Sequence, residues 1–460
     1  MTPHAAPDLK YSIYDGIFAN IFATLTGGVF LTGFALYLGM NELMIGLVAS
    51  MPFIVTVFQL PASYLISKTG KRKEVSCWAA ALARAIWIPI VIVTLISFSS
   101  LSTKILIILS LLFLSYTFIS ISYVSWLSWM SDLVPEESRG SFFGTRNMIC
   151  GAAGMIVLVI FGKLLDSLNG HVLGGLPLGF GITFISAVSL GMLSLHFLTR
   201  VPESGLENQP AYHSSFSGQI HLPFSEPNFR NFLIFSLLWS FSVYFASPFF
   251  TLYFLRDLKF GYGFVATLGM LSAAADLIGM QLWGRISDRA QNKAVIRAAG
   301  WVAIFIPLAW VSVRPQSIVI PMMLHLAGGG FWSGVNLCMN NLLLKISPQE
   351  NKASFISIYN IVGGIGAATG PIAGGLVLKY MSELNLQLFS VTLLPLQVLF
   401  ITSTLLRLLS FQLFKYVREP EEVTVGQMVR ILRSVRGLNM ASGFSNLLHP
   451  SVLGTRKRGE

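Results

Sequence analysis

The hydrophobic and polar positions of the chain alternate on the scale of whole helices. Apolar runs of about 20 residues, the length that crosses a bilayer as an α-helix, recur from end to end between short polar breaks. The pattern predicts an all-α polytopic membrane protein with twelve transmembrane helices. The expected limits of the spans are 13–38, 44–67, 76–98, 104–131, 143–167, 175–198, 229–255, 263–287, 294–313, 316–345, 353–380 and 386–414.

Composition excludes most other classes of protein. Of the 460 residues, 54% are hydrophobic and 11% charged, whereas soluble domains carry about 25% charged residues. Cys77, Cys150 and Cys338 lie in or beside apolar segments without pair spacing, which indicates neither a disulfide framework nor a metal site. The sequence carries no His-Glu-x-x-His, Gly-x-Ser-x-Gly or phosphate-loop motif. We therefore expect no enzyme activity, no metal and no cofactor.

The distribution of basic residues predicts the orientation in the membrane. Lys and Arg gather in alternate loops and after the last span, and cytoplasmic loops are the ones that carry this excess. The net charge of +11 follows from this bias, so no nucleic-acid partner is expected. We expect a monomer in the lipid bilayer of the cytoplasmic (inner) membrane, with both termini in the cytoplasm.

An internal repeat divides the chain into two halves. "VPEESRGSFFGTRN" from Val134 aligns with "SPQENKASFISIYN" from Ser347, and "SYLISKTGKRK" from Ser63 aligns with "GRISDRAQNK" from Gly284. Both pairs follow equivalent spans, after the second and the fourth of each half, and parallel repeats of this kind are found in secondary transporters. The expected domains are a six-helix bundle at 1–199, a cytoplasmic linker at 200–228, a second six-helix bundle at 229–415 and a basic tail at 416–460.

The repeated loops carry a resemblance to a known family. Over about residues 10–415 the chain resembles the major facilitator superfamily, whose loop after the second span reads approximately Gly-x-x-x-Asp-Arg-x-Gly-x-Arg-Lys. The resemblance implies two pseudo-symmetric six-helix bundles and a gating role for these loops. The first half departs from the pattern, with Ser63 and Ser67 at the glycine and aspartate positions. The gating candidates of the two loops are Lys68, Gly70, Arg72, Gly284, Asp288 and Arg289.

A glycine-rich stretch in the eleventh span is a further gating candidate. "GIGAATGPIAGG", from Gly364 to Gly375, is similar to a Gly-x-x-x-Gly-Pro-x-x-Gly-Gly signature that the family usually shows in its fifth span. Small residues at a spacing of four line one helix face and let two helices approach closely. We expect Gly366, Gly370, Pro371 and Gly374 to form a contact surface that slides or flexes; the alternative is tight packing without motion.

Polar residues inside apolar spans predict a binding site. In this family the first, fourth, seventh and tenth spans line the central cavity, and polar side chains that face lipid are costly. In the tenth span the polar residues recur every three or four positions and form one stripe. The alternative for any one of these residues is a hydrogen bond between helices. The solute-binding candidates are Asn20, Thr24, Tyr123, Trp239, Tyr244, His325, Trp332, Asn336 and Asn340.

Ionisable residues near the midplane suggest proton coupling. Asp276 and His325 both lie deep within their spans, where a carboxylate costs about 2.5–3.5 kcal/mol. We expect Asp276 to exchange a proton during transport, with His325 as its partner; the alternative is a structural hydrogen bond. Arg84 also has two interpretations: its side chain extends towards the membrane interface, or it binds an anion.

The tail is expected to contact the membrane surface. From Met428 to Leu438, apolar residues fall on one helical arc and arginines on another, with Gly437 as a stop. This pattern is typical of an amphipathic helix on anionic lipid. A binding site for a partner protein is the alternative.

Two functions remain open from the sequence. The first is a proton-coupled secondary active transporter that moves a small solute by alternating access, which the polar stripe and Asp276 favour. The second is a receptor or membrane assembly factor that resembles the family but does not transport, which the degenerate first loop at Ser67 favours.

Overall fold

The computed structural model describes residues 9–96, 100–168, 170–173, 176–203, 216–381, 387–388 and 391–419. Within these ranges, eleven helical segments are long and apolar enough to cross a membrane. A twelfth helix, α15 (Val319–Ile346), is 28 residues long but less apolar, because it carries His325, Asn336 and Asn340. The prediction of an all-α polytopic membrane protein is confirmed.

The helices of the N-terminal half form six spans, three of which are broken into shorter pieces. The first span turns at Gly28, whose φ of +49° suits glycine. A two-stranded hairpin, β1 (Val172–Leu173) and β2 (Leu176–Pro177), precedes the sixth span. The helices are α1 (Lys10–Leu25), α2 (Gly28–Tyr37), α3 (Glu42–Ile54), α4 (Gln59–Thr69), α5 (Arg72–Ala85), α6 (Trp87–Leu95), α7 (Leu101–Leu133), α8 (Glu136–Ser167) and α9 (Leu178–Arg200).

The C-terminal half repeats this arrangement. Its seventh span also breaks, between α11 and α12, and continues into a π-helical turn at Tyr253–Asp257. The helices are α10 (Phe216–Ser225), α11 (Pro227–Tyr244), α12 (Ser247–Leu252), α13 (Tyr262–Ala290), α14 (Asn292–Trp310), α15, α16 (Lys352–Met381) and α17 (Pro395–Leu413).

Two details differ from the expected limits. The predicted linker at 200–228 contains the helix α10, which the sequence pattern did not predict. The last span begins at Pro395 rather than near 386, because β3 (Gln387–Leu388) and β4 (Val391–Thr392) pair as a short hairpin before it. The division into domains stays a prediction. The expected amphipathic helix between Met428 and Leu438 lies outside the described residues.

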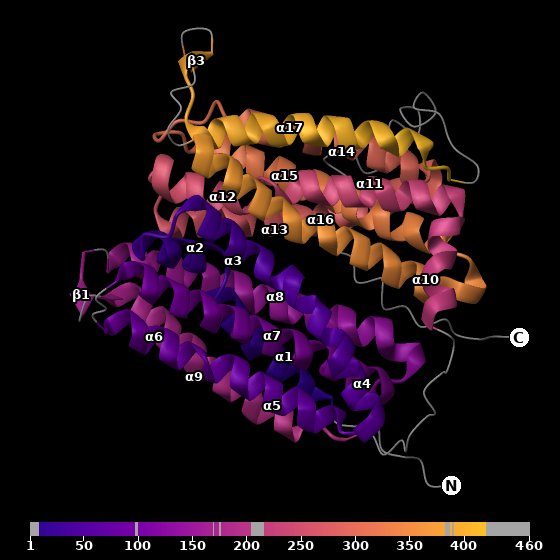
Figure 1. The fold of residues 1–460 in the computed structure, drawn as a ribbon, viewed down its shortest axis with the longest axis horizontal. Helices are drawn as coiled ribbons and strands as arrows, with labels where there is room; N and C mark the ends of the chain where they lie inside the picture. The colour runs from indigo at the N-terminus through magenta and orange to yellow at the C-terminus, as the bar shows by residue number, and fades with distance from the viewer. Residues whose placement is uncertain are drawn as a thin grey trace, which may run out of the picture.

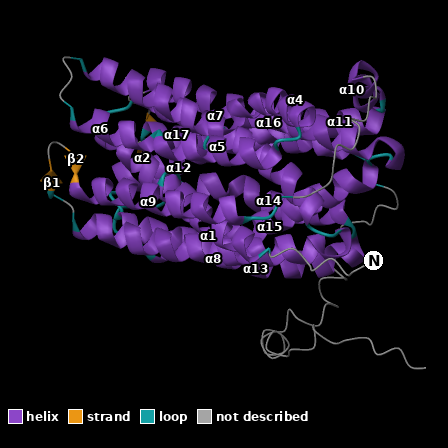
Figure 2. Cartoon of the chain, turned by 90° about the horizontal axis from the view of Figure 1, so that it is seen from below, coloured by secondary structure: helices purple, strands orange, loops and turns teal. Residues whose placement is uncertain are grey.

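The two halves form separate bundles that lie side by side. In Figure 1 the indigo-to-magenta helices α1–α9 fill the lower part and the pink-to-yellow helices α11–α17 the upper part. The long helices run along one common direction (Figure 2), with β1 and β2 at one end and α4 and α10 at the other. We call the end with α4 and α10 the terminal end, because the first described helix, α1, begins there and the last, α17, ends there, and the opposite end the far end.

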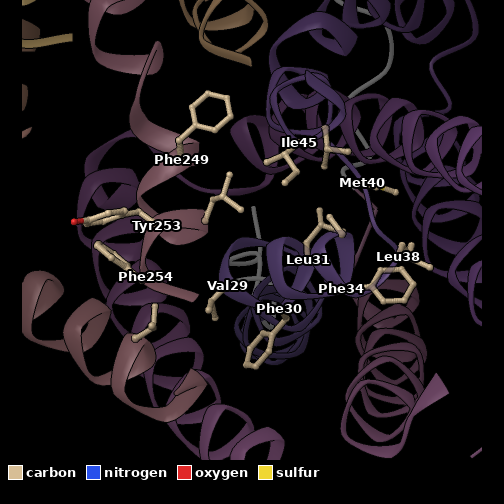
Figure 3. Close-up of a cluster of buried hydrophobic side chains, with 14 of the residues drawn as sticks. Val29, Phe30, Leu31, Phe34, Leu38, Met40, Ile45, Phe249, Tyr253 and Phe254 are labelled. Atoms are coloured by element: carbon tan, nitrogen blue, oxygen red, sulfur yellow. The ribbon is translucent and has the colours of Figure 1, made fainter. Parts of the chain in front are cut away.

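Hydrophobic packing joins the bundles at the far end. The largest buried cluster contains residues of both halves, among them Phe30 and Phe34 of α2 and Phe249, Tyr253 and Phe254 of the seventh span (Figure 3). The two smaller clusters each belong to one half: one is built from α11 and its neighbours, the other around Trp129 and Met130. The bundles are therefore fastened to each other mainly at the far end.

The glycines of α16 make two different contacts. Gly366, Gly370 and Gly374 face α11 of the same half, and a Cβ on Gly370 would lie 2.7 Å from the Phe241 carbonyl oxygen. On the other side, a Cβ on Gly375 would lie 2.7 Å from the Glu42 carbonyl oxygen of α3, in the other half. One glycine-rich helix thus packs closely both within its bundle and across the junction of the bundles.

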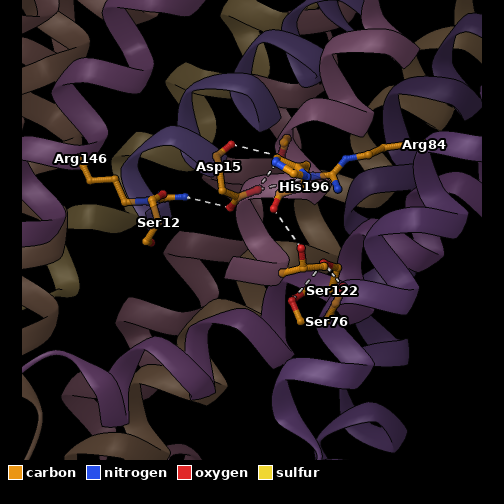
Figure 4. Close-up of polar contacts among 9 residues, drawn as sticks. Ser12, Asp15, Ser76, Arg84, Ser122, Arg146 and His196 are labelled. Carbon is orange, nitrogen blue, oxygen red and sulfur yellow. Dashed lines mark hydrogen bonds and ion pairs between the residues drawn. The ribbon is translucent and has the colours of Figure 1, made fainter. Parts of the chain in front are cut away.

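A charged cluster holds the N-terminal bundle together. The Asp15 carboxylate accepts a hydrogen bond from Ser194 Oγ at 2.5 Å, and Arg84 Nη2 donates to the same hydroxyl at 2.8 Å (Figure 4). Arg84 and Arg146 each place a guanidinium nitrogen 3.9 Å from an Asp15 carboxylate oxygen. Asp15 and Arg84 are buried, and the Arg146 side chain is 12% exposed. The cluster links α1, α5, α8 and α9.

We expect Gly370→Ala to destabilise the protein by about 1–3 kcal/mol, because the added methyl group would overlap backbone atoms of α11 that have little room to move. Gly364→Ala is the matched control, since a Cβ there meets nothing within 4 Å. Thermal unfolding of both purified variants tests the difference. Equal melting temperatures would contradict close packing at Gly370.

We expect Asp15→Asn to cost about 3–5 kcal/mol, because it leaves the buried guanidinium group of Arg84 and the largely buried one of Arg146 without their counter-ion. The control is Glu74→Gln, which breaks the exposed pair with Lys71 and should cost about 0.5 kcal/mol or less. Thermal unfolding measures both. A tolerant Asp15→Asn variant would show that the cluster does not stabilise the bundle.

Candidate functional site

The C-terminal half contains a partly open cavity of about 850 Å³, which is lined by residues from all six spans of this half. Predicted solute-binding and proton-coupling residues of this half line it together: Trp239, Tyr244, Asp276, His325, Trp332, Asn336 and Asn340. Their roles stay predictions. The structure does bring these residues, from α11, α13 and α15, to one space.

The polar stripe of α15 faces the cavity because the helix packs closely on α13. Gly329 lies directly against the Ser272 carbonyl group, and a Cβ on Gly279 would lie 2.7 Å from the Gly330 carbonyl oxygen. Trp283 Nε1 also donates a hydrogen bond to Gly330 O at 2.8 Å. These contacts set the rotation of α15, and this rotation turns His325, Trp332 and Asn336 towards the cavity.

Asp276 and His325 line the same cavity without bonding to each other. Among the described residues, no ion pair or hydrogen bond joins Asp276 to any side chain. His325 packs its ring against Trp310 and Phe254, at centroid distances of 5.6 and 5.7 Å. Its Nε2 atom is buried and has no hydrogen-bond partner in the described part of the chain. The partnership expected between Asp276 and His325 is therefore not a direct bond in this conformation.

The lining also contains side chains that were not predicted as site residues. Trp310 of α14 and Tyr359 of α16 add aromatic surface, and Arg407 of α17 adds a positive charge. Arg407 is only 3% exposed. The sequence feature that could have identified Arg407 is its position inside an apolar span, where a charged residue usually has a function. The ninth, eleventh and twelfth spans were outside the set that the family resemblance marked as lining.

The solute-binding candidates of the N-terminal half lie apart from this cavity. Asn20 Nδ2 donates to Cys150 O at 2.7 Å and so links α1 to α8. Thr24 Oγ1 donates to the Asn20 carbonyl oxygen within α1. Tyr123 is 55% exposed and stacks on Trp126. For Asn20 and Thr24, hydrogen bonding accounts for the polar side chains in this conformation.

The loop residues predicted to act in gating lie at the terminal end, each against its own half. Gly70 ends α4 with a φ of +71°, and Arg72 pairs with Asp132 of α7. Asp288 lines a smaller cavity of about 360 Å³ between the ends of α13, α14 and α15. Lys68 and Arg289 are exposed, and Gly284 lies within α13. In the described part of the chain, these six residues make no hydrogen bond or ion pair to the other bundle.

Polar contacts close the far end across the junction of the bundles. Arg256 Nη1 donates to the Glu42 carboxylate at 2.6 Å, and Arg256 Nε donates to Asp257 at 2.8 Å. The Asp166 carboxylate accepts hydrogen bonds from the backbone N–H groups of Tyr262 and Gly263 at 2.7 and 2.8 Å. An acid at a helix N-terminus satisfies free N–H groups and complements the helix dipole. Thus α3 and α8 are tied to the seventh span and α13.

Similar proteins point to one family. Two curated relatives are each named "Multi-drug resistance efflux pump PmrA homolog". One, from Lactococcus lactis subsp. lactis (strain IL1403), is 26% identical over 143 residues, which are 29% of this chain and 34% of that protein. The other, from Lactococcus lactis subsp. cremoris, is 28% identical over 79 residues, 17% of this chain and 63% of that protein. The chain therefore spans less than two thirds of the length of these relatives.

Solved structures show the fold over nearly the whole chain. A mutant of the nucleoside transporter NupG superposes with a TM-score of 0.69 at 14% identity, covering 89% of this chain and 100% of that one. A D-xylose–proton symporter superposes with a TM-score of 0.64 at 15% identity, covering 90% and 98%. A bacterial homologue of the iron transporter ferroportin gives 0.66 at 14% identity, covering 89% and 98%.

The sequence itself carries the family signature. The family model of the Major Facilitator Superfamily matches residues 16–371, which is more than half of the chain and includes most of both bundles. The two six-helix bundles agree with the fold of the superposed structures. This membership also agrees with the expectation that the chain is not an enzyme. The chain is a multi-pass membrane protein that belongs to the Major Facilitator Superfamily.

Proposed function

We propose that the chain is a secondary transporter that carries a small solute across the membrane by alternating access. The observation that supports it best is the cavity of about 850 Å³, which lies inside the membrane-spanning bundle and is lined by both aromatic and polar side chains. Such a combination is typical of sites for small molecules, in which apolar walls supply contact area and a few polar groups supply orientation.

The proposed transport cycle requires the two bundles to move relative to each other at their junction. Contacts at the far end tie the bundles together through Glu42, Arg256 and Asp166, while the clusters at the terminal end belong to one bundle each. Rocking about the far end alters access to the cavity from the terminal end. A conformation that opens the far end requires these polar contacts to break. The excess of Lys and Arg in the loops of the terminal end supports a cytoplasmic position for this end, and the location that we propose is the cytoplasmic (inner) membrane.

Asp276 is the candidate for proton coupling. It lines the cavity on α13, in the middle of a membrane-spanning helix. A permanently charged carboxylate is costly at this depth in the bilayer. A carboxyl group that takes up and releases a proton avoids this cost for part of the transport cycle. Transport of a solute with a proton would follow if both bind in the same conformation. A receptor or assembly factor that does not transport is the alternative, and the cavity favours transport over it.

We expect Asp276→Asn to abolish uphill accumulation of the solute while exchange across the membrane continues, because the amide cannot exchange a proton. The measurement uses proteoliposomes with and without a pH gradient, loaded with members of a small solute library. Glu350→Gln, which removes an exposed carboxylate of the same half, should accumulate solute like the wild type. Full accumulation by Asp276→Asn would refute the coupling role, and wild-type vesicles that move no solute would favour the receptor.

We expect Arg256→Gln to open the far end more often, because it removes the contact with Glu42. A partly exposed ion pair is worth up to about 1 kcal/mol, which is roughly a fivefold change in the ratio of conformations. The measurement is the rate at which an impermeant maleimide, added at the far face, labels a cysteine at cavity residue Ser247 in a variant without the native cysteines. The control is Arg314→Gln, which removes an exposed charge at the same end. An unchanged labelling rate would show that the pair does not hold the far end closed.

A further inference from the structure

Arg407 is a buried positive charge in the wall of the cavity. Its guanidinium group donates from Nη1 to Ala303 O at 2.9 Å and from Nη2 to Val243 O at 3.4 Å. Its Nε atom is buried without a hydrogen-bond partner among the described residues. The group lies 5.7 Å from the centre of the Trp332 ring, which also lines the cavity. The positive charge is thus fixed in place by neutral carbonyl groups.

The N-terminal bundle also contains a buried arginine, Arg84, but its contacts differ from those of Arg407. Arg84 of the third span reaches Asp15 of the first and Ser194 of the sixth. Arg407 of the twelfth span reaches Val243 of the seventh and Ala303 of the ninth. Both arginines therefore sit where the first, third and sixth spans of a bundle meet.

The difference between the two junctions is the counter-ion. Asp15 supplies a carboxylate in the first bundle, whereas no described carboxylate forms an ion pair with Arg407. The charged lining of the cavity consists of Arg407 and Asp276, which lie on different helices and make no ion pair with each other. A guanidinium ion in a low-dielectric site is stabilised strongly by an anion that accepts its hydrogen bonds.

The rest of the lining fits an aromatic or apolar body. Trp239, Trp310 and Trp332 come from three different helices, and Tyr244, Phe250 and Tyr359 extend the aromatic surface. Asn336 and Asn340 offer amide groups along one side. Aromatic walls supply contact area for a planar solute. A fixed positive charge beside these walls selects a solute that carries an anionic group.

We propose that Arg407 anchors the anionic group of the solute, and that the solute is a small organic anion with an aromatic or apolar body. This inference rests on the proposed transport function and names the solute class for the same cavity. The planar guanidinium group favours a carboxylate, whose two oxygens match its paired donors. Arg407 thus determines specificity, while Asp276 of α13 remains the candidate for the proton.

The test is binding of matched solute pairs to the purified full-length protein in lipid nanodiscs. The probes are benzoate, 1-naphthoate and indole-3-acetate, each paired with its neutral primary amide, and calorimetric titration gives the dissociation constants. We expect the wild type to bind at least one carboxylate about tenfold or more tightly than its amide, as for a hydrogen bond to a charged group. In Arg407→Gln the ratio of the two dissociation constants, amide over carboxylate, should fall towards one.

Two further variants separate recognition from folding. Arg407→Lys keeps the charge but loses the planar pair of donors, so its preference should be intermediate. Arg314→Gln, an exposed arginine of the same half, should keep the full preference. Thermal unfolding and gel filtration show which variants are folded. If Arg407→Gln does not fold, the wild type and Arg407→Lys still decide the outcome.

Three results would overturn the inference. They are equal affinity of the wild type for both members of every pair, binding of no probe at all, and full anion preference in a folded Arg407→Gln protein. The proposed function is judged separately from these results. Accumulation of neutral solutes in proteoliposomes would keep the transport proposal while the anion proposal falls.

Discussion

The membrane interior provides no water to satisfy polar groups, and this constraint governs the structure. Each polar or charged side chain inside a span must turn towards protein, a cavity or the interface. The Asp15 cluster, the stripe of α15 and the Arg407 junction are three consequences of this constraint. Without a hydrophobic force between helices in lipid, close contact through small residues such as Gly329 and Gly370 holds the helices together.

The two bundles have the same architecture but use it for different purposes. The first bundle neutralises its buried arginine with Asp15 and thereby joins four helices. The second bundle holds its arginine with backbone carbonyl groups and leaves the charge beside a cavity. The repeated fold thus contains one buried arginine beside a carboxylate and one buried arginine in the wall of a cavity. The asymmetry agrees with the placement of Asn20 and Thr24, which bond within their own bundle.

The far end and the cavity share residues. Phe254 and Trp310 line the cavity and also belong to the hydrophobic cluster that joins the bundles at the far end. Both rings contact His325. Under the proposed function, a solute that displaces these rings would act directly on the packing that joins the bundles. Occupation of the cavity would then be coupled to the conformation of the far end.

The sequence by itself determined the fold class, the positions of the spans and the inward face of α15. These follow from hydrophobic length, from the internal repeat and from helical spacing, all of which are local or periodic properties of the chain. The β3–β4 hairpin and α10 escaped prediction, since short elements in polar segments have little periodicity.

Only the tertiary structure decided which polar residues share a cavity. Asn20 and Asn336 look alike in sequence, yet Asn20 bonds to Cys150 and Asn336 faces the cavity. Arg84 and Arg407 were both buried charges within apolar spans, and the difference between them is an aspartate that lies 69 positions from Arg84 in the chain but beside it in space. Contacts of this kind depend on the rotation and packing of whole helices, which no local pattern of residues records.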